Sequence, residues 1–167
     1  MINTILLKGH LSKNKLNQAL EEVNSIHFGS SNKTVSIVIS SDGGNAVSAV
    51  DFVCRLNGLP LKYEVKIYEA SSAAAYIALA IGSELEMSKS ATLSIHRGGV
   101  TLGPTEIDKE GKVSKPILEG LRKYDTALIE TMKNFNFSEC TDELYATDWL
   151  RLPAEECLKR GIVQRLF

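Results

Sequence analysis

The chain has 167 residues, and its 19 basic and 20 acidic residues give a formal net charge of −1. Because neither sign forms a long run, we expect neither nucleic acid nor an anionic membrane as the main partner. The length suits one domain over residues 1–167, long enough to bury a core without support from a metal or a disulfide.

The cysteines and the apolar segments indicate the cellular compartment. The three cysteines, Cys54, Cys140 and Cys157, are scattered, and their spacing matches neither a disulfide framework nor a metal site. We therefore expect a reducing, cytoplasmic setting and predict neither a metal nor a cofactor. No basic segment followed by an apolar one opens the chain, and the longest apolar stretch, residues 73–81, is too short to span a bilayer.

The first half of the chain alternates between short apolar segments and amphipathic ones. Strands are predicted at residues 2–7, 35–39 and 63–68. A helix capped by Ser12 is predicted between the first two strands, ending before Gly29. A second helix, with Val47, Val50, Val53 and Cys54 toward the core and Leu56 as a further candidate, is predicted to end at 57–58.

The second half begins with an alanine-rich helix at residues 71–82, followed by short strands at 84–87 and 92–95. Residues 97–112 read as a loop or ribbon. A long amphipathic helix is then predicted, its apolar stripe formed by Ile117, Leu121, Tyr124, Leu128 and Met132.

The C-terminal part is predicted to hold a short helix at 138–146, a last helix opened by Pro153, and a strand at 162–166. The alternation of strands and helices in the first half predicts right-handed βαβ units and a mostly parallel sheet. The fold class is therefore α/β.

A glycine pair sits in the predicted turn between the second strand and its helix, in the sequence Ser41-Asp42-Gly43-Gly44. Glycines let the backbone approach a ligand, and the N-terminus of the following helix offers N–H groups without partners. Such a turn suits an oxyanion or a phosphate, but neither a P-loop nor a G-x-G-x-x-G pattern is present. The same four residues also fit an ordinary tight turn that binds no ligand.

Two serines, Ser71 and Ser72, follow the third predicted strand and open the alanine-rich helix. A hydroxyl in this position lies at the positive end of a helix dipole, and the small neighbours leave room for a substrate carbonyl. Taken alone, either serine also fits an ordinary helix N-cap.

His96 ends the strand predicted at 92–95 and precedes Gly98 and Gly99. A serine hydroxyl is a poor nucleophile unless a base such as histidine takes its proton, and a carboxylate best orients that base. His10 and His27 lack such surroundings and are expected at the surface.

Taken in order, these segments resemble the ClpP peptidase family, including its phage-encoded relatives. The resemblance covers nearly the whole chain and rests on five segments. They are Ile5-Leu-Leu-Lys-Gly-His-Leu11, Ile39-Ser-Ser-Asp-Gly-Gly44, Glu69-Ala-Ser-Ser-Ala-Ala-Ala75, Ala91-Thr-Leu-Ser-Ile-His96, and the pair Asp148-Trp-Leu150 with Ala154-Glu-Glu-Cys-Leu-Lys-Arg-Gly-Ile-Val163.

The resemblance implies the ClpP/crotonase-like spiral of βαβ units with a projecting handle helix, the handle region covering about 98–134. It implies a serine endopeptidase with Ser72 as nucleophile, His96 as general base and Asp148 as the carboxylate that orients the histidine. The backbone N–H groups of Gly44 and Ala73 would form the oxyanion hole.

The resemblance also implies the partners. Gly43, Gly98 and Gly99 would bind an extended peptide or unfolded protein substrate by strand addition. The handle would join subunits into a homo-oligomer of one ring or of stacked rings. Whether an unfoldase ATPase is also a partner stays open, because the chain begins at the first strand, without the N-terminal segment that forms the axial gate in bacterial ClpP.

Several departures from the family pattern keep alternatives open. The spacing from Ser72 to His96 differs by about one residue from the usual family spacing, so Ser71 remains a candidate nucleophile. Asp142 remains a second candidate for the carboxylate that orients the histidine. Asp42 stands where the family has proline, beside the expected oxyanion hole. The alternatives to a peptidase are a catalytically degenerate ClpP-like assembly subunit and a crotonase-like protein that handles acyl-CoA.

Overall fold

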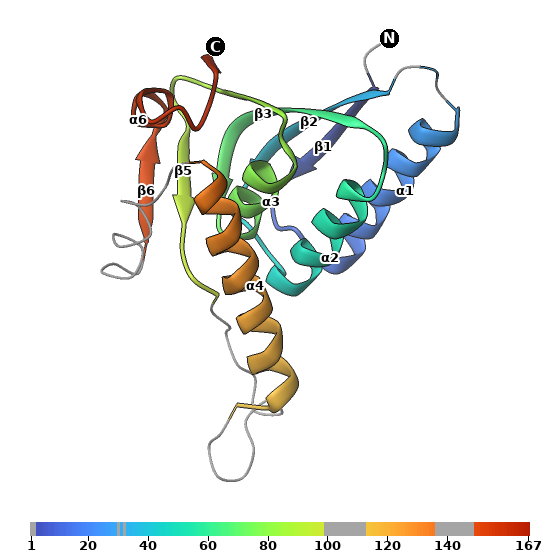
Figure 1. Ribbon diagram of the computed structural model, residues 1–167, viewed down its shortest axis with the longest axis vertical. Helices are drawn as coiled ribbons and strands as arrows, with labels where there is room; N and C mark the ends of the chain where they lie inside the picture. Colours follow the sequence, from blue (N-terminus) through green and yellow to red (C-terminus); the bar gives the residue numbers. More distant parts are fainter. Residues whose placement is uncertain (1–2, 30, 32, 99–112, 136–148) are drawn as a thin grey trace.

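The computed structural model describes residues 3–29, 31, 33–98, 113–135 and 149–167. The helix predicted at 138–146 and nearly all of the loop predicted at 97–112 lie outside the described residues. Within them, the chain folds as a mixed α/β domain with a largely parallel sheet, as predicted (Figure 1).

Within the described ranges the sheet has seven strands, and its main path runs β1-β2-β3-β4-β7. Every pairing along this path is parallel, and β5 joins the C-terminal end of β3 while β6 pairs antiparallel with β5. The strands are β1 (Asn3–Lys8), β2 (Thr34–Ser41), β3 (Lys62–Ser71), β4 (Glu84–Met87), β5 (Thr92–Ile95), β6 (Leu150–Pro153) and β7 (Arg165–Leu166).

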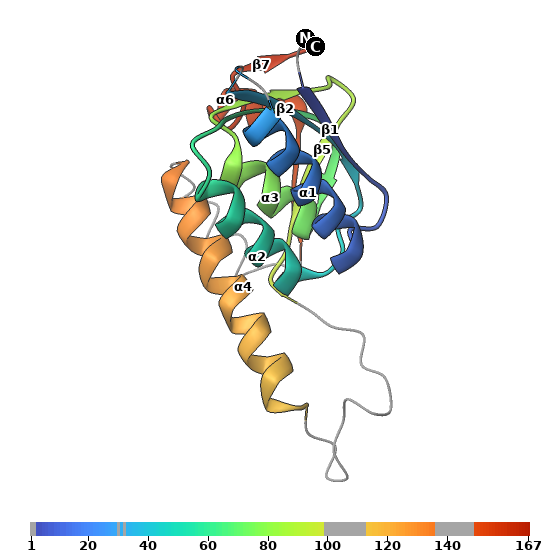
Figure 2. The ribbon, with the colours of Figure 1, turned by 90° about the vertical axis from the view of Figure 1, so that its right-hand side faces the viewer.

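Three helices cover one face of this sheet and a fourth packs on them, whereas α6 lies beside β5, β6 and β7. Helices α1, α2 and α3 lie side by side on the same face of β1, β2 and β3, and α4 packs across α2 and α3 (Figures 1 and 2). The helices of the described residues are α1 (Lys13–Gly29), α2 (Ala46–Asn57), α3 (Ala73–Ile81), α4 (Lys115–Asn134) and α6 (Ala154–Lys159).

Local sequence signals explain where the first helices begin. The Ser12 hydroxyl accepts a hydrogen bond from the Lys15 N–H, and the Asn45 carboxamide accepts one from the Ser48 N–H. Each cap satisfies an N–H that the first turn of a helix leaves without a partner. Helix α3 follows β3 directly and is almost wholly buried, as its alanines allow.

The predicted inward face of α2 is partly wrong. Val47 and Cys54 are exposed, whereas the buried residues are Ala49, Phe52, Val53 and Leu56. The buried set has the spacing i, i+3, i+4, i+7 of a helix that turns one stripe to the core. Val53 and Leu56 are buried as predicted, whereas Val47 and Cys54 belong to a neighbouring stripe that is apolar too.

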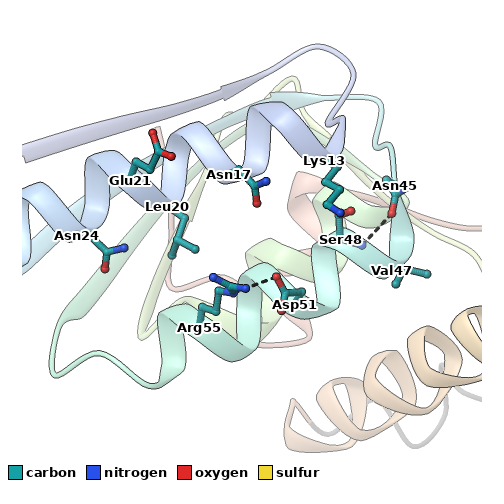
Figure 3. Close-up of a pocket in the computed structure, with 10 residues that line it drawn as sticks. All are labelled: Lys13, Asn17, Leu20, Glu21, Asn24, Asn45, Val47, Ser48, Asp51 and Arg55. Carbon is teal, nitrogen blue, oxygen red and sulfur yellow. Dashed lines mark hydrogen bonds and ion pairs between the residues drawn. The ribbon is translucent and has the colours of Figure 1, made fainter.

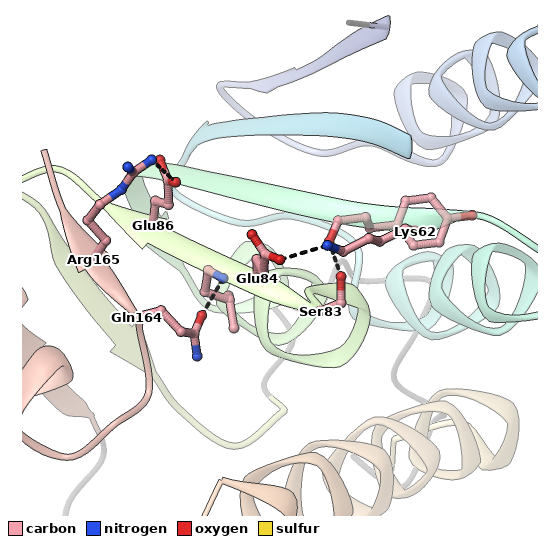
Figure 4. Close-up of polar contacts among 8 residues, drawn as sticks. Lys62, Ser83, Glu84, Glu86, Gln164 and Arg165 are labelled. Atoms are coloured by element: carbon pink, nitrogen blue, oxygen red, sulfur yellow. Dashed lines mark hydrogen bonds and ion pairs between the residues drawn. The ribbon is translucent and has the colours of Figure 1, made fainter. Parts of the chain in front are cut away.

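The face of the sheet opposite the helices carries charged cross-strand pairs (Figure 4). Lys62 Nζ lies 2.6 Å from Glu84 Oε1 across β3 and β4, and Arg165 of β7 pairs with Glu86 of β4. Exposed pairs of this kind add little to the free energy of unfolding. Their opposite charges do favour the observed register of three parallel strands over a shifted one.

Helix α4 has two halves with different surroundings. Its C-terminal half buries Tyr124, Leu128 and Met132, whereas Ile117 and Leu121 are only partly buried. The N-terminal end of α4 projects away from the sheet and from α1, α2 and α3 (Figures 1 and 2). This is the projecting helix that the resemblance implied. No helix of the described residues is both long enough and apolar enough to cross a membrane.

Candidate active site

Ser72 occupies a strained turn between β3 and α3. Its φ of 54° is the one positive φ of a non-glycine residue within the described part of the chain. Backbone in such a region costs about 1–3 kcal/mol and persists where surrounding structure holds it. Here the Ser72 N–H donates to the Ser94 carbonyl at 2.8 Å, which ties the turn to β5.

The register of β3 and β5 brings Ser72 and His96 together. Ser71 pairs with Ser94 in the parallel ladder, so the residues that follow each strand leave the sheet at the same edge. His96 Nε2 lies 2.6 Å from Ser72 Oγ. This distance is within direct proton transfer range for a nucleophile and its general base. The Ser71 hydroxyl makes no such contact with a described residue.

The environment of His96 favours its neutral form. Burial lowers the pKa of the imidazole, while a hydrogen bond with the Arg97 backbone and the negative charge of Asp125 oppose that change. A neutral imidazole at neutral pH can accept the proton of Ser72.

Two side chains that the sequence analysis missed contact the histidine segment. The Trp149 ring stacks on His96, with ring centroids 4.0 Å apart. Asp125 of α4 accepts a hydrogen bond from the Gly98 N–H at 2.6 Å and pairs with Arg97 at 3.3 Å. Asp125 directly follows Tyr124, which belonged to the predicted apolar stripe, but no local pattern indicated that its carboxylate would bind the segment after His96.

The glycine turn packs directly against Ser72. A Cβ added at Gly43 would lie 2.7 Å from Ser72 Cβ, closer than real carbon atoms approach, and the φ of Gly43 is +107°. The buried Ser41 hydroxyl donates to the Gly9 carbonyl at 2.7 Å and accepts from the Gly43 N–H at 3.0 Å. Glycine at position 43 is therefore required for the close approach of the turn to the serine.

Two backbone N–H groups beside Ser72 have no hydrogen-bond partner among the described residues. The Leu11 N–H donates to the Gly43 carbonyl and the Asn45 N–H donates to the Leu11 carbonyl, which leaves the Gly44 N–H between them without an acceptor. Ala73 is the first residue of α3, where helix geometry provides no intrahelical acceptor for its N–H. Such donors suit a site where negative charge develops.

Of the residues predicted for the site, the structure groups Ser72, His96, Gly43, Gly44 and Ala73 around one strand edge. Gly98 lies against α4. Asp148, Asp142 and Gly99 lie outside the described residues. Asp42, whose charge was expected beside the turn, is exposed to solvent.

A separate cavity of about 800 Å³ opens between α1 and α2 (Figure 3). It is lined by side chains such as Lys13, Asn17, Asp51 and Arg55, and neither Ser72 nor His96 contributes to it. Its lining carries no nucleophile paired with a base. Among the described residues no group of three or more His, Cys, Asp or Glu side chains could hold a metal ion.

The fold has a counterpart among solved structures. The chain is similar to the ClpP protease catalytic domain from Plasmodium falciparum, with a TM-score of 0.75 and 15% sequence identity, over 99% of this chain and 85% of that chain. No protein-family model matches the sequence, and no curated protein matches it. At this identity the likeness establishes the ClpP-like fold, and the predicted fold class is confirmed.

Proposed function

We propose that this protein is a serine endopeptidase of ClpP type that hydrolyses peptide bonds through an acyl-enzyme at Ser72. The observation that carries the proposal is the 2.6 Å contact between Ser72 Oγ and His96 Nε2, on a strained turn within a ClpP-like fold. A helix N-cap needs neither the strain nor the histidine.

The first half-reaction forms the acyl-enzyme. Ser72 Oγ attacks the peptide carbonyl carbon and its proton passes to His96 Nε2. The carbonyl oxygen becomes negative and accepts hydrogen bonds from the N–H groups of Gly44 and Ala73. The C–N bond then breaks, and the departing amine takes the proton from His96.

The second half-reaction releases the acyl group. A water molecule gives a proton to His96 Nε2 as its oxygen attacks the ester carbonyl, and the same two N–H groups stabilise the charged intermediate. When the ester C–O bond breaks, Ser72 Oγ recovers its proton from His96. His96 serves as base and then as acid in each half, and its lowered pKa keeps it neutral and able to act first as the base.

For the third member of the triad we propose Asp148, with Asp142 as the alternative. Support comes from Trp149, the residue directly after Asp148 in the sequence, because its ring stacks on His96. A carboxylate hydrogen-bonded to the imidazole would hold its tautomer and stabilise the protonated form. The Asp125 carboxylate accepts a hydrogen bond from the Gly98 N–H and pairs with Arg97, so we do not propose it as the carboxylate of the triad.

The proposed substrate is an extended peptide or an unfolded protein, bound by Gly43, Gly98 and Gly99 through strand addition. The proposed assembly is a ring-shaped homo-oligomer, in which the projecting half of α4, with Leu118 exposed, contacts other subunits. Light scattering at working concentration checks this part of the proposal, and a strict monomer would contradict it.

Peptide hydrolysis tests the function directly. Assembled protein is expected to cleave an unfolded protein such as reduced casein, and Ser72→Ala is expected to abolish the cleavage while leaving assembly unchanged. Cleavage that survives in Ser72→Ala would contradict the proposed nucleophile. A crotonase-like protein needs only the paired N–H donors, so thermal stabilisation by a coenzyme A thioester without peptide cleavage would favour that alternative, and assembly with neither would favour the degenerate subunit.

A further inference from the structure

Tyr124 lies between the two segments that carry Ser72 and His96, because it packs against Tyr76, whose N–H donates to the Ser72 carbonyl, and against Gly98, two residues after His96. It lies on α4, its side chain is fully buried, and its ring meets that of Tyr76 edge to face with centroids 5.5 Å apart. Gly98 packs against the same ring, since a Cβ added at Gly98 would lie 3.3 Å from Tyr124 Cδ1. The ring is therefore held between α3 and the segment that follows His96.

The Tyr124 hydroxyl is buried and makes no hydrogen bond to any described residue. A buried hydroxyl without a partner destabilises a fold, so phenylalanine would suit a purely structural role better. Burial raises the pKa of this hydroxyl strongly and the charge of Asp125 adds to the rise, whereas the neighbouring Ser72 side chain opposes it. Tyr124 thus keeps its proton at any working pH, beside the nucleophile.

We infer that Tyr124 is a further catalytic residue, whose hydroxyl donates a hydrogen bond to Ser72 Oγ as negative charge develops on that oxygen. The inference rests on the proposed function and extends it. No proton leaves Tyr124: the proton of Ser72 passes to His96 Nε2, and the tyrosine contributes only the hydrogen bond.

The hydrogen-bonding capacity of Ser72 allows this role. In the resting enzyme the Ser72 hydroxyl donates to His96 Nε2, which leaves lone pairs on Oγ free to accept. Charge appears on Oγ when it loses its proton before attack, and again when it departs from the acyl group. Because this hydrogen bond is absent in the resting state and forms in the transition state, its whole free energy lowers the activation barrier.

The test compares the inactivation rate constants of assembled wild type, Tyr124→Phe and Tyr76→Phe with a fluorophosphonate. Tyr76→Phe is the matched control because its ring packs against that of Tyr124 in the same buried cluster. Tyr124→Phe is expected to slow inactivation about two- to tenfold, the rate equivalent of one neutral hydrogen bond, while Tyr76→Phe stays within about twofold of wild type.

Two further readouts separate catalysis from structure. In the pH dependence of the inactivation rate, Tyr124→Phe is expected to have the same midpoint as wild type, whereas a displaced His96 would shift it. The thermal unfolding midpoint of Tyr124→Phe is expected to be unchanged or higher, whereas lost packing would lower it. Inactivation of Ser72 at the wild-type rate in Tyr124→Phe would overturn the inference and leave the peptidase intact. A wild-type protein that does not react at all would overturn both.

Discussion

Ser72 Oγ and His96 Nε2 lie 2.6 Å apart because β3 and β5 are adjacent parallel strands that end at the same edge of the sheet. Parallel strands place the residues that follow them at one edge, which is where α/β sheets carry their sites. The pairing of Ser71 with Ser94 then sets which residues face each other. A shift of this register by one residue would send one of the two side chains to the other face.

Backbone strain at Ser72 predicts an unusual order of stabilities. At position 72, where φ is 54°, the glycine variant is expected to be more stable than the alanine variant by about 1 kcal/mol or more. At Ser71, the last residue of β3, the order is expected to reverse, because glycine weakens a strand. Urea denaturation of the four variants measures both differences. The same order at the two positions would contradict the strain.

The close packing of the glycine turn predicts a steric effect on the nucleophile. Gly43→Ala would bring a Cβ to 2.7 Å from Ser72 Cβ and 2.8 Å from the Ser71 carbonyl, so the turn or the serine must move. We expect a loss of about 1–3 kcal/mol in the free energy of unfolding and slower reaction with a fluorophosphonate.

The matched control is Gly29→Ala, at the end of α1, where an added Cβ meets no atom within 4 Å. This variant is expected to stay within about 0.5 kcal/mol of wild type and to react at the wild-type rate. If Gly43→Ala behaved in the same way, the turn could not be packed against Ser72 as observed.

The lowered pKa of His96 predicts the pH dependence of activity. The imidazole is an effective base only when neutral, so the rate is expected to rise as pH increases through its pKa. Burial places that pKa below the usual value of 6.5. The ascending limb of kcat/KM against pH is therefore expected to have its midpoint below 6.5. A midpoint above that value would contradict this prediction, and it would show that the carboxylate proposed for the triad raises the pKa of His96 by more than burial lowers it.

The charge of Asp125 allows a second test of the pH dependence of kcat/KM. Because that charge raises the pKa of His96, Asp125→Asn is expected to move the midpoint to still lower pH. Asp51→Asn removes an exposed carboxylate of α2 that pairs with Arg55, and it is expected to leave the midpoint unchanged. Equal effects of the two variants would exclude a specific influence of Asp125 on His96.

The choice between Asp148 and Asp142 can be made by substitution. Asp148→Asn is expected to lower kcat by roughly three to four orders of magnitude, as loss of the orienting carboxylate does in serine peptidases, with little change in KM. Asp142→Asn is expected to retain most of the activity. The reverse result would assign the third role to Asp142, and full activity in both variants would mean that no aspartate at these positions serves the triad.

Local patterns predicted much of the fold. The strands at 84–87 and 92–95 have the predicted bounds, and the last helix begins directly after Pro153. These elements carry strong local signals, namely β-branched or alternating residues and a proline suited to the start of a helix. Where two stripes of α2 were both apolar, sequence periodicity could not identify the one that faces the sheet.

Elements that depend on contacts between distant parts of the chain were predicted less well from the sequence. Strand β6 was not predicted, because four residues that alternate between buried and exposed positions become a strand only through antiparallel pairing with β5. The terminal strand, predicted over 162–166, is confined to Arg165–Leu166. The roles of Trp149 and Asp125 depend on contacts across elements distant in sequence, which no local pattern carries. Ser72 and His96 were identified through the order of several weak motifs.

Covalent labelling tests the central claim most directly. Assembled protein is treated with a fluorophosphonate probe, and the adduct is mapped by mass spectrometry in wild type and in His96→Ala. The proposed mechanism predicts one adduct at Ser72 in wild type and its loss in His96→Ala, since the Oγ cannot react quickly without its base. Absence of labelling in assembled wild-type protein, or an adduct at Ser71 in place of Ser72, would contradict the claim that Ser72 is the nucleophile.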